Sequence, residues 1–436
     1  MPLTPEDALD ATLSDYAWNA RGLPVGLAVS GGGDSVALLH VAAERRARID
    51  TPLLAVTVDH GLRPGSAEEA RGVAEACARL GVPHETLAWT DWDGRGNLQD
   101  RAREARRRLV AGWAKRHRAH VVLLAHTADD QVETVLLRLA RGSGVDGLAG
   151  MGPAFEAGGV EWARPFLDLA RDTLRDWLRV RGLAWVEDPS NEDPRFDRAR
   201  ARAMMGHLAD LGLTRERLLR TADHQRRART TLREAAVAWV AAHARVEGGD
   251  AVLDRLPHPG RWRGGDTEWR VLAGAVQWVG GGARHPPRWE GLVGVVGALR
   301  EGRAATLGGC VLTPEGSGAR VTRELRAAAG PTEAEPARGF WAMWDRWVVS
   351  HESHWDKAVA APRADVRVAA LGGEGLAQCP GWRDAGLPRL SLLATPGVWE
   401  GARLVAAPAA GWAEGFRAVV AWDLSRFLRM RWGMGG

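Results

Sequence analysis

Short, fully apolar stretches alternate with longer stretches of helical periodicity over the first half of the chain. Residues 23–30, 52–59, 82–89 and 120–125 are predicted strands, with 183–187 as a candidate fifth strand. Residues 35–47, 66–80, 97–118 and 129–141 are predicted helices. Strands that are apolar on both faces and separated by helices are typical of a parallel sheet covered on both sides. The pattern predicts a doubly wound α/β domain, whose ligands bind at the carboxyl ends of the strands.

The second predicted helix carries a signal at each end. Ser66 and Glu69 have the spacing of a capping box, which predicts that Ser66 caps the helix N-terminus. Gly81 stands where a chain commonly leaves a helix in the left-handed conformation. Both signals favour a helix that ends just before Gly81.

The pattern changes beyond residue 197. An arginine-rich helical region runs to about residue 245, and glycines at 248–249 and 280–282 punctuate a smaller unit that ends near 326. Residues 327–338 are a predicted linker, and the remainder is rich in Trp, Gly and short β-like runs. We therefore predict a catalytic domain at 1–212, a mainly helical middle domain at 213–326 and a small mixed C-terminal domain at 339–436.

Composition places the chain among soluble globular proteins. Of its 436 residues, 45% are hydrophobic and 26% are charged. The sequence contains no apolar run of the ~20 residues that cross a bilayer, and it begins without a secretion signal, so we expect a cytoplasmic protein without membrane contact. Cys77, Cys310 and Cys379 are far apart, which excludes a disulfide framework and a cysteine metal cluster and predicts buried, inert thiols.

Arginine and tryptophan are unusually frequent. Lys115 and Lys357 are the only lysines, and 21 Trp outnumber 6 Phe and one Tyr. Arginine forks match phosphates and Trp stacks on bases, so this bias is compatible with RNA binding. It is equally compatible with the base composition of a genome, which we favour for the bias as a whole. Only the placement of the charges can argue for RNA. The tail tryptophans, such as Trp341, Trp344, Trp399 and Trp412, are expected in a core.

The strongest chemical signal is the loop S-G-G-G-D-S at residues 30–35, between a predicted strand and a helix. Its glycines let the backbone approach a ligand closely, and its N–H groups and the helix N-terminus attract an anion. No G-K-[ST] follows, so this is not a Walker A loop, and it is not a G-x-G-x-x-G dinucleotide loop. A turn that merely joins strand to helix is the simpler alternative.

The loop resembles the pyrophosphate-binding loop, S-G-G-x-D-S, of the N-type ATP pyrophosphatases. That resemblance implies cleavage of ATP between the α and β phosphates and adenylation of an oxygen atom on the substrate. Further motifs lie at residues 58–63, 126–134, 141–144 and 186–191, with Asn97, Arg101, Arg103, Arg106 and the pair Arg164-Pro165. Together they resemble the tRNA(Ile)-lysidine synthase family over most of the first 200 residues. Arg107 and Asp197-Arg198-Ala199 depart from the common family pattern, which puts individual RNA contacts in doubt.

The resemblance implies ATP and Mg²⁺ as cofactors, with a CAU-anticodon tRNA and free L-lysine as partners and no obligate protein partner. We expect Ser30, Gly31, Gly32, Gly33, Asp34 and Ser35 to bind ATP, and Asp34 and Asp129 to hold Mg²⁺. Asp34, His126, Asp130 and Glu133 are the predicted catalytic residues, and Asp130 and Glu133 are predicted to bind lysine. Arg101, Arg103, Arg106, Arg107 and Arg198 are the predicted tRNA contacts.

Two other functions stay open on the sequence alone. Another member of the same superfamily is one, although a tRNA thiolase needs well-placed cysteines and an amidating synthetase needs a glutaminase partner. A non-catalytic protein that binds ATP and RNA is the other. Release of pyrophosphate in the presence of tRNA and lysine would separate these functions from lysidine formation.

Overall fold

The chain packs as two compact units, Met1–Arg229 and Thr230–Trp432. The computed structural model describes residues 3–17, 22–49, 51–61, 65–92, 94–95, 98–187, 193, 195–258, 265–282, 286–333, 341–354 and 366–433.

A six-stranded sheet in the order β3-β2-β1-β4-β6-β5 forms the centre of the first unit. Its strands are β1 (Val25–Ala28), β2 (Leu53–Asp59), β3 (His84–Ala88), β4 (Val121–Leu123), β5 (Ala154–Ala157) and β6 (Val160–Ala163). All neighbours pair in parallel except β5 and β6. The four predicted strands are confirmed. The candidate fifth strand is wrong, because Val186 makes only an isolated bridge to Gly32, and the fifth parallel strand is instead the short β6.

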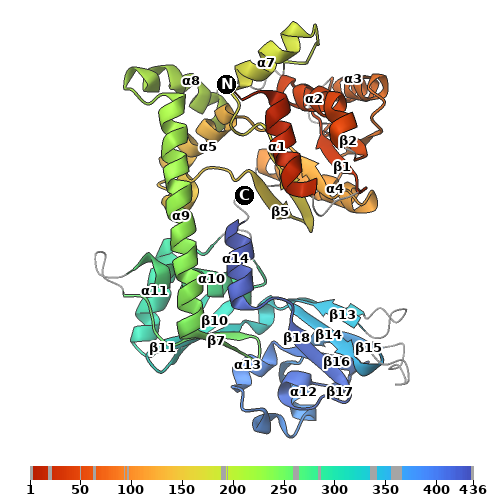
Figure 1. The fold of residues 1–436 in the computed structure, drawn as a ribbon. Helices are drawn as coiled ribbons and strands as arrows, with labels where there is room; N and C mark the ends of the chain where they lie inside the picture. Colours follow the sequence, from red (N-terminus) through yellow and green to blue (C-terminus); the bar gives the residue numbers. More distant parts are fainter. Residues whose placement is uncertain are drawn as a thin grey trace. The chain divides into compact units, whose positions relative to one another are not determined.

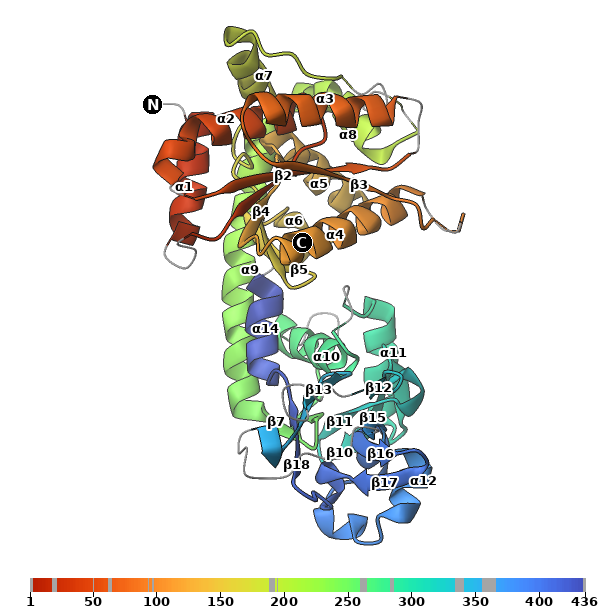
Figure 2. The same ribbon diagram turned by 90° about the vertical axis from the view of Figure 1, so that its right-hand side faces the viewer.

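Helices cover both faces of this sheet, as predicted. The helices of this unit are α1 (Pro5–Ala17), α2 (Gly33–Ile49), α3 (Ser66–Arg79), α4 (Leu98–Arg116), α5 (Ala128–Ala140), α6 (Val145–Leu148), α7 (Arg171–Val180), α8 (Asp197–Asp210) and the start of α9 (Arg215–His243), of which α6 and α8 pack on α5. Figure 2 shows α2 and α3 on one face and α4 on the other. Alternate strand residues feed the two cores: Leu27 packs with α2, whereas Val122 packs with Trp113 of α4. Gly26 leaves room for that indole, since a Cβ there would lie 2.8 Å from Trp113.

The ends of α3 correct one prediction and confirm another. Gly65, with φ +93°, is the N-cap, and no side-chain bond caps this end, so the predicted capping box at Ser66 is wrong. Ser66 already belongs to the helix, and its hydroxyl stands one position too late. At the other end Gly81 has φ +62° and donates its N–H to Ala78, while Val82 donates to Cys77. These bonds satisfy the last carbonyls of the helix, as the glycine predicted.

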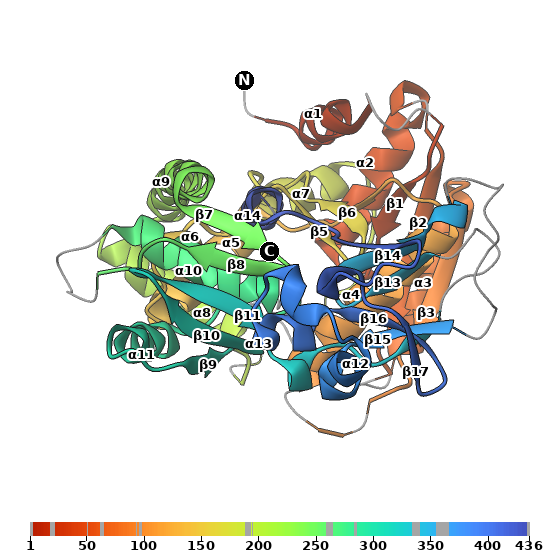
Figure 3. The same cartoon turned by 90° about the horizontal axis from the view of Figure 1, so that it is seen from below.

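The second unit contains three sheets (Figures 1 and 3). The largest has the order β7-β8-β11-β10-β9, with β7 (Ala244–Glu247), β8 (Asp250–Leu253), β9 (Ala305–Leu307), β10 (Cys310–Glu315) and β11 (Gly318–Arg323). Helices α10 (Asp266–Val279) and α11 (Trp289–Arg300) pack on it. The region predicted as mainly helical therefore also contains a sheet.

Two smaller sheets follow in the second unit. One joins β12 (Thr332–Glu333), β15 (Val366–Ala370), β16 (Pro396–Glu400) and β17 (Arg403–Ala406), and the other joins β13 (Trp341–Trp344), β14 (Trp347–His351) and β18 (Phe416–Val420). Short helices lie before or between their strands: η2 (Leu325–Ala327), η3 (Glu352–His354), α12 (Gly372–Gln378), η4 (Trp382–Ala385), α13 (Arg389–Leu393) and η5 (Pro408–Ala410). Helix α14 (Leu424–Gly433) follows the last strand. Of the four tail tryptophans expected in a core, Trp344 and Trp399 are buried, whereas Trp341 and Trp412 are only half-buried.

The middle and C-terminal regions share a core. Leu424 and Leu428 of α14 are buried in the cluster formed by α10, α11 and the five-stranded sheet. The predicted linker is not wholly a connection, because Thr332 and Glu333 form β12 and pair with β15, while residues 334–338 lie outside the described part. The three-domain division stays a prediction, but these two regions fold against each other.

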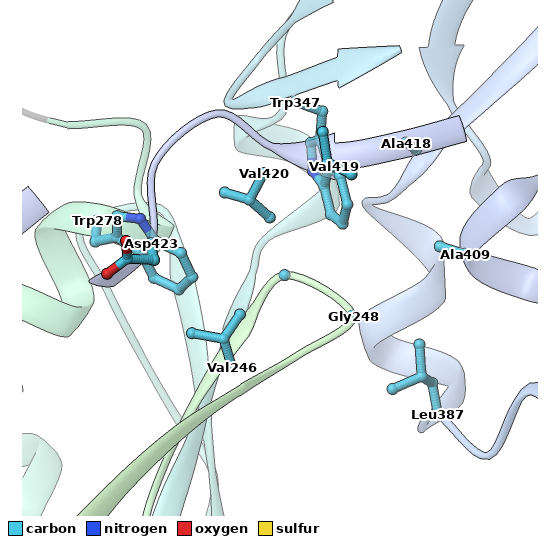
Figure 4. Close-up of a pocket in the computed structure, with 11 residues that line it drawn as sticks. Val246, Gly248, Trp278, Trp347, Leu387, Ala409, Ala418, Val419, Val420 and Asp423 are labelled. Atoms are coloured by element: carbon cyan, nitrogen blue, oxygen red, sulfur yellow. The ribbon is translucent and has the colours of Figure 1, made fainter. Parts of the chain in front are cut away.

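Within the second unit, a cavity of about 480 Å³ lies beside the β7–β8 turn (Figure 4). Its lining is mostly apolar and includes Trp278, Trp347 and Val420, with Asp423 as its one charged residue. None of the predicted site residues lines it.

The cysteines behave as predicted. Cys77, Cys310 and Cys379 are buried free thiols, and burial raises the pKa of Cys77 to about 11. A thiol with so high a pKa is a poor nucleophile. Within the described ranges, no helix has both the length and the apolar character to cross a membrane.

Candidate functional site

The glycine-rich loop joins β1 to α2 and is held by its own hydroxyl groups. Ser35 Oγ donates to the Gly32 carbonyl at 2.9 Å and accepts the Ser30 N–H at 3.1 Å. Gly31 has φ +88°, a conformation that residues with a Cβ rarely adopt. The loop is thus fixed in shape directly before the N-terminus of α2, where a helix attracts anions.

The segment after α7 closes over this loop. Val186 donates its N–H to the Gly31 carbonyl at 3.1 Å. A Cβ on Gly33 would lie 3.1 Å from the Trp185 indole, so the third glycine leaves room for this close packing. Residues 183–187 therefore support the loop without forming a strand.

Three of the predicted catalytic carboxylates surround one guanidinium group. Arg171, at the start of α7, contacts Asp34 at 3.1 Å, Asp130 at 3.1 Å and Glu133 at 3.7 Å. Burial, together with the charge of Asp130, raises the pKa of Asp34 to about 6 although Arg171 opposes the shift. The contacts bring the loop residue on α2 together with the two carboxylates on α5, which the sequence placed in separate motifs.

Asp130 completes the capping box at the start of α5. Its Oδ2 accepts the N–H of Thr127 at 2.8 Å and the Thr127 hydroxyl at 3.0 Å. Its Oδ1 accepts from Arg171 and, at 3.5 Å, from Arg198. Both oxygens therefore already accept hydrogen bonds. Asp130 fixes the start of α5 and also contributes a negative charge to the site.

Glu133 differs from its neighbour because one of its oxygens lacks a partner. Its Oε1 accepts two bonds from Arg202, at 2.9 and 2.7 Å. Its Oε2 is buried and has no hydrogen-bond partner among the described residues. A buried acceptor without a donor is costly, by about 1–3 kcal/mol, which marks this oxygen as a place where a ligand can donate.

His126 is a neutral hydrogen-bond donor in this site. Arg164 donates from Nε to His126 Nδ1 at 3.3 Å, and from NH1 to the Gly152 carbonyl at 2.6 Å. Burial is the main reason that the pKa of His126 falls to about 3, and Arg164 adds to it. Since Nδ1 accepts, the proton of the neutral ring is on Nε2.

Arginines from separate elements gather beside these groups. Burial lowers the pKa of Arg103 to about 10, and the charges of Arg198, Arg107 and Arg106 lower it further. Burial likewise lowers the pKa of Arg164 to about 10, with Arg107 and Arg198 contributing. Four predicted tRNA contacts, Arg103, Arg106, Arg107 and Arg198, thus act on one another electrostatically. We call these four and Arg164 the arginine cluster.

Arg101 and Asp129 are the remaining predicted site residues, and neither lies in the arginine cluster. Arg101 is exposed and pairs with Glu104 at 3.4 Å. Asp129 accepts the backbone N–H of Arg171 at 2.7 Å and a bond from Arg215 at 3.2 Å. Asn97, Leu62, Arg63 and residues 188–191 of the motifs lie outside the described residues.

Several site residues were missed from the sequence. Arg164 was noted only as part of a motif, although it fixes the tautomer of His126. Arg171, on α7, carried no sequence signal beyond the arginine content of its region. Arg202, on α8, was visible only as one of the alternating arginines at 198, 200 and 202, a pattern that predicts phosphate contact and not the observed pairing with Glu133. Pairing with carboxylates 38 to 137 positions away cannot be read from local spacing.

Comparisons with known proteins agree on the family. The PP-loop domain model matches residues 7–208. The tRNA(Ile)-lysidine synthase of Ruegeria pomeroyi is 46% identical over 395 residues, which cover 90% of each chain. That of Methylobacterium nodulans is 43% identical over 324 residues, covering 70% of this chain and 91% of its own. Similarity of this extent reaches well beyond the PP-loop region, and the chain belongs to the tRNA(Ile)-lysidine synthase family.

Proposed function

We propose that the chain uses ATP to join lysine to the wobble cytidine of a CAU-anticodon tRNA. The C2 oxygen of the cytidine attacks the α phosphate, an O–P bond forms, and pyrophosphate leaves. The ε-amine of lysine then attacks C2, and AMP leaves with that oxygen to give lysidine. The main support is that Arg171 contacts three carboxylates at once. Through Asp34 it contacts the glycine-rich loop, and through Asp130 and Glu133 it contacts the start of α5.

The loop at residues 30–35 binds the pyrophosphate half of ATP. Its fixed backbone and the N-terminus of α2 offer donors to phosphate oxygens, and holding them in place lowers the barrier to in-line attack. Mg²⁺, when bound, neutralises phosphate charge. Asp34 fits that ion, because its buried carboxylate has a raised pKa and gains from added positive charge. Asp129 fits less well, since donors already occupy both oxygens, and phosphates and water would complete the shell.

Glu133 receives the amine of the substrate lysine. Its partnerless Oε2 lacks a donor, and an ammonium group supplies one. Lysine attacks as the free amine, whose reference pKa is about 10.4, so a proton must pass to a base. His126 cannot serve as that base, because Arg164 already occupies its Nδ1. The proton therefore passes to Glu133, because both oxygens of Asp130 already accept hydrogen bonds, while His126 Nε2–H donates to phosphate or to the activated base.

The arginine cluster holds the backbone of the anticodon loop. Its members come from α4, α8 and the end of β6, and their mutual repulsion is relieved when phosphates enter. The second unit selects and positions the tRNA, since it contains none of the ATP-loop residues. Residues 213–326 and 339–436 contribute jointly, because α14 packs in the core of the middle region.

Labelled lysine provides the direct test. Full-length protein incubated with ATP, Mg²⁺, CAU-anticodon tRNA and labelled lysine should transfer label to the tRNA and release one pyrophosphate for each label. Pyrophosphate release without labelled tRNA would instead indicate another PP-loop enzyme. Binding of tRNA without pyrophosphate release would indicate the non-catalytic alternative.

A further inference from the structure

Two tryptophans follow β3 at the carboxyl edge of the first unit's sheet. Trp89 is 9% exposed, and its ring meets the His60 ring edge-on, with centroids 5.8 Å apart. Trp92 is 43% exposed and lies against Trp89 at 6.3 Å with a 40° tilt. The three rings form a continuous aromatic array, and Trp92 is its solvent-facing member.

This array is anchored to the basic helix α4. Arg106 donates to His60 Nε2, with its nitrogens at 3.1 and 3.3 Å. Arg108 pairs with Asp91, which lies between the two tryptophans in the sequence. Figure 2 shows β3 running beside α4 in the same unit. The exposed ring is therefore packed against Trp89, and it is linked to Arg106 of the arginine cluster through Trp89 and His60.

His60 itself is neutral, and this suits a stacking array. Burial, with help from Arg106, lowers its pKa to about 4. The groups that act on it from neighbouring elements are Arg106 of α4 and Asp59 of β2. An uncharged ring behind Trp89 adds no repulsion toward the neighbouring arginines.

We propose that Trp92 is a stacking platform for one unpaired base of the bound RNA, a neighbour of the wobble cytidine whose phosphate lies on Arg103 and Arg106. The proposal rests on the proposed function for the identity of the RNA. An exposed indole offers a flat apolar face, and stacking on an aromatic side chain is tolerant of base identity. Arg106, bonded to His60 at the inner end of the array, supplies the charge that a nucleotide needs and that an apolar peptide would not use. A base with its phosphate matches both halves of this surface.

The experiment places the fluorescent base 2-aminopurine at each position of the anticodon loop in turn. Stacking on Trp92 should quench one position flanking the wobble cytidine in the wild-type complex. Trp92→Ala should remove that quenching and weaken tRNA binding by about 5- to 150-fold, the range expected for one stacked base. Trp92→Phe keeps an aromatic face and should restore most of both. Binding of an ATP analogue should be unchanged in each variant.

The matched control is Trp289→Ala. Trp289 is 55% exposed and is also backed by a tryptophan, Trp269, at 4.5 Å, but it belongs to the second unit. This variant should leave the quenching pattern intact. The platform is overturned if the quenching pattern of Trp92→Ala is the same as that of the wild type at every labelled position. It is also overturned if that variant binds tRNA as tightly as the wild type.

The two proposals fail separately. If the protein forms no lysidine but Trp92-dependent quenching persists, the platform stands and the chemistry is wrong. If lysidine forms at the wild-type rate and affinity in Trp92→Ala, the chemistry stands and the platform is wrong.

Discussion

Arginines are buried in both units, but their charges are balanced in different ways. In the second unit, Arg320 contacts Glu247, Asp250 and Glu315, and Arg323 contacts Asp345. In the first unit, the arginine cluster brings five guanidinium groups together. Burial, and after it the charges of neighbouring cluster members, lowers the pKa of Arg103, Arg106 and Arg164. Residue type alone therefore does not distinguish a structural arginine from a functional one.

The two kinds of buried arginine differ in which charges would remain if the side chain were removed. A guanidinium paired with buried carboxylates stabilises the fold, since its loss strands those charges. A guanidinium surrounded by other guanidinium groups is repelled by them in the free protein, and bound phosphates relieve that repulsion. Arg346 is a third case: buried in the second unit, it lies over the rings of Trp278 and Trp347, at 4.9 and 5.9 Å. The predictions below test whether this contrast holds.

The largest effect is expected from Arg320→Met in the second unit. Removing this guanidinium strands Asp250, which is buried, and should lower the free energy of unfolding by about 3–5 kcal/mol. Arg245→Met is the matched control, because exposed Arg245 contacts two of the same acids, Glu247 and Glu315. That control should cost less than about 1 kcal/mol. Chemical denaturation measures both, and equal losses would contradict the structural role of Arg320.

The glycine-rich loop should show the largest effect on activity. Asp34→Ala and Ser35→Ala should each lower tRNA-dependent pyrophosphate release by about 100- to 1000-fold, the cost of losing a positioned group at developing charge. Circular dichroism should remain that of the wild type. Asp176→Ala, on the exposed side of α7, is the control and should retain full activity. Near-normal release from both loop variants would remove the loop from the site.

Glu133→Gln should act mainly on lysine. The variant loses the charge beside the partnerless Oε2, and a charge-assisted contact contributes about 1.5–3 kcal/mol, or about 10- to 100-fold in affinity. Steady-state kinetics with lysine and ATP varied separately should show a raised KM for lysine and a nearly unchanged KM for ATP. The reverse result would assign Glu133 to the metal–nucleotide site.

The neutral state of His126 predicts a dependence of stability on pH. Its pKa is depressed to about 3, so between that value and 6.5 the unfolded chain binds more protons than the folded one. The contribution of His126 to stability should therefore fall as pH falls below 6.5, by up to about 1.4 kcal/mol per pH unit, or tenfold in the unfolding equilibrium. Asp34, whose pKa is raised to about 6, contributes with the opposite sign below that pH, so the comparison with a His126 variant isolates the histidine. The charged groups acting on this ring are Asp130, Arg164, Arg198 and Arg103.

His126→Gln tests this directly. Unfolding of the nucleotide-free protein at pH 7 and pH 5.5 should show a smaller difference in the variant than in the wild type. An identical difference in both would mean that His126 is already charged or already exposed, and that Arg164 does not fix its tautomer.

The sequence predicted the first unit well because its signals are local. Buried parallel strands are apolar along their length, and a glycine-rich turn is visible in six consecutive letters. The short β6, Val160–Ala163, was missed because its letters alternate and it is too short to stand out. The capping residue of α3 was misplaced by one position, since Gly65 leaves no side-chain signal.

The site was predicted only in part, because much of it depends on contacts between distant elements. The motifs identified Asp34, Asp130 and Glu133 individually, but not the shared contact with Arg171. Nor did they show that α14 returns to pack Leu428 in the core of the middle region. Tertiary pairing at long sequence separation has no periodicity to follow.

The smallest effect is expected from single members of the arginine cluster on α4. Each phosphate contact contributes roughly 0.7 to 0.9 to the slope of log affinity against log salt, so Arg106→Ala or Arg107→Ala should reduce the slope by about that much. Over a fourfold change in salt this alters affinity only about threefold. Arg116→Ala is the matched control, since Arg116 lies on the same helix but pairs with Glu85 at 3.0 Å. Its slope should match the wild type, because its charge is already balanced. If all three variants keep the wild-type slope, α4 is a solvated face, and the clustering of arginines does not identify the RNA surface.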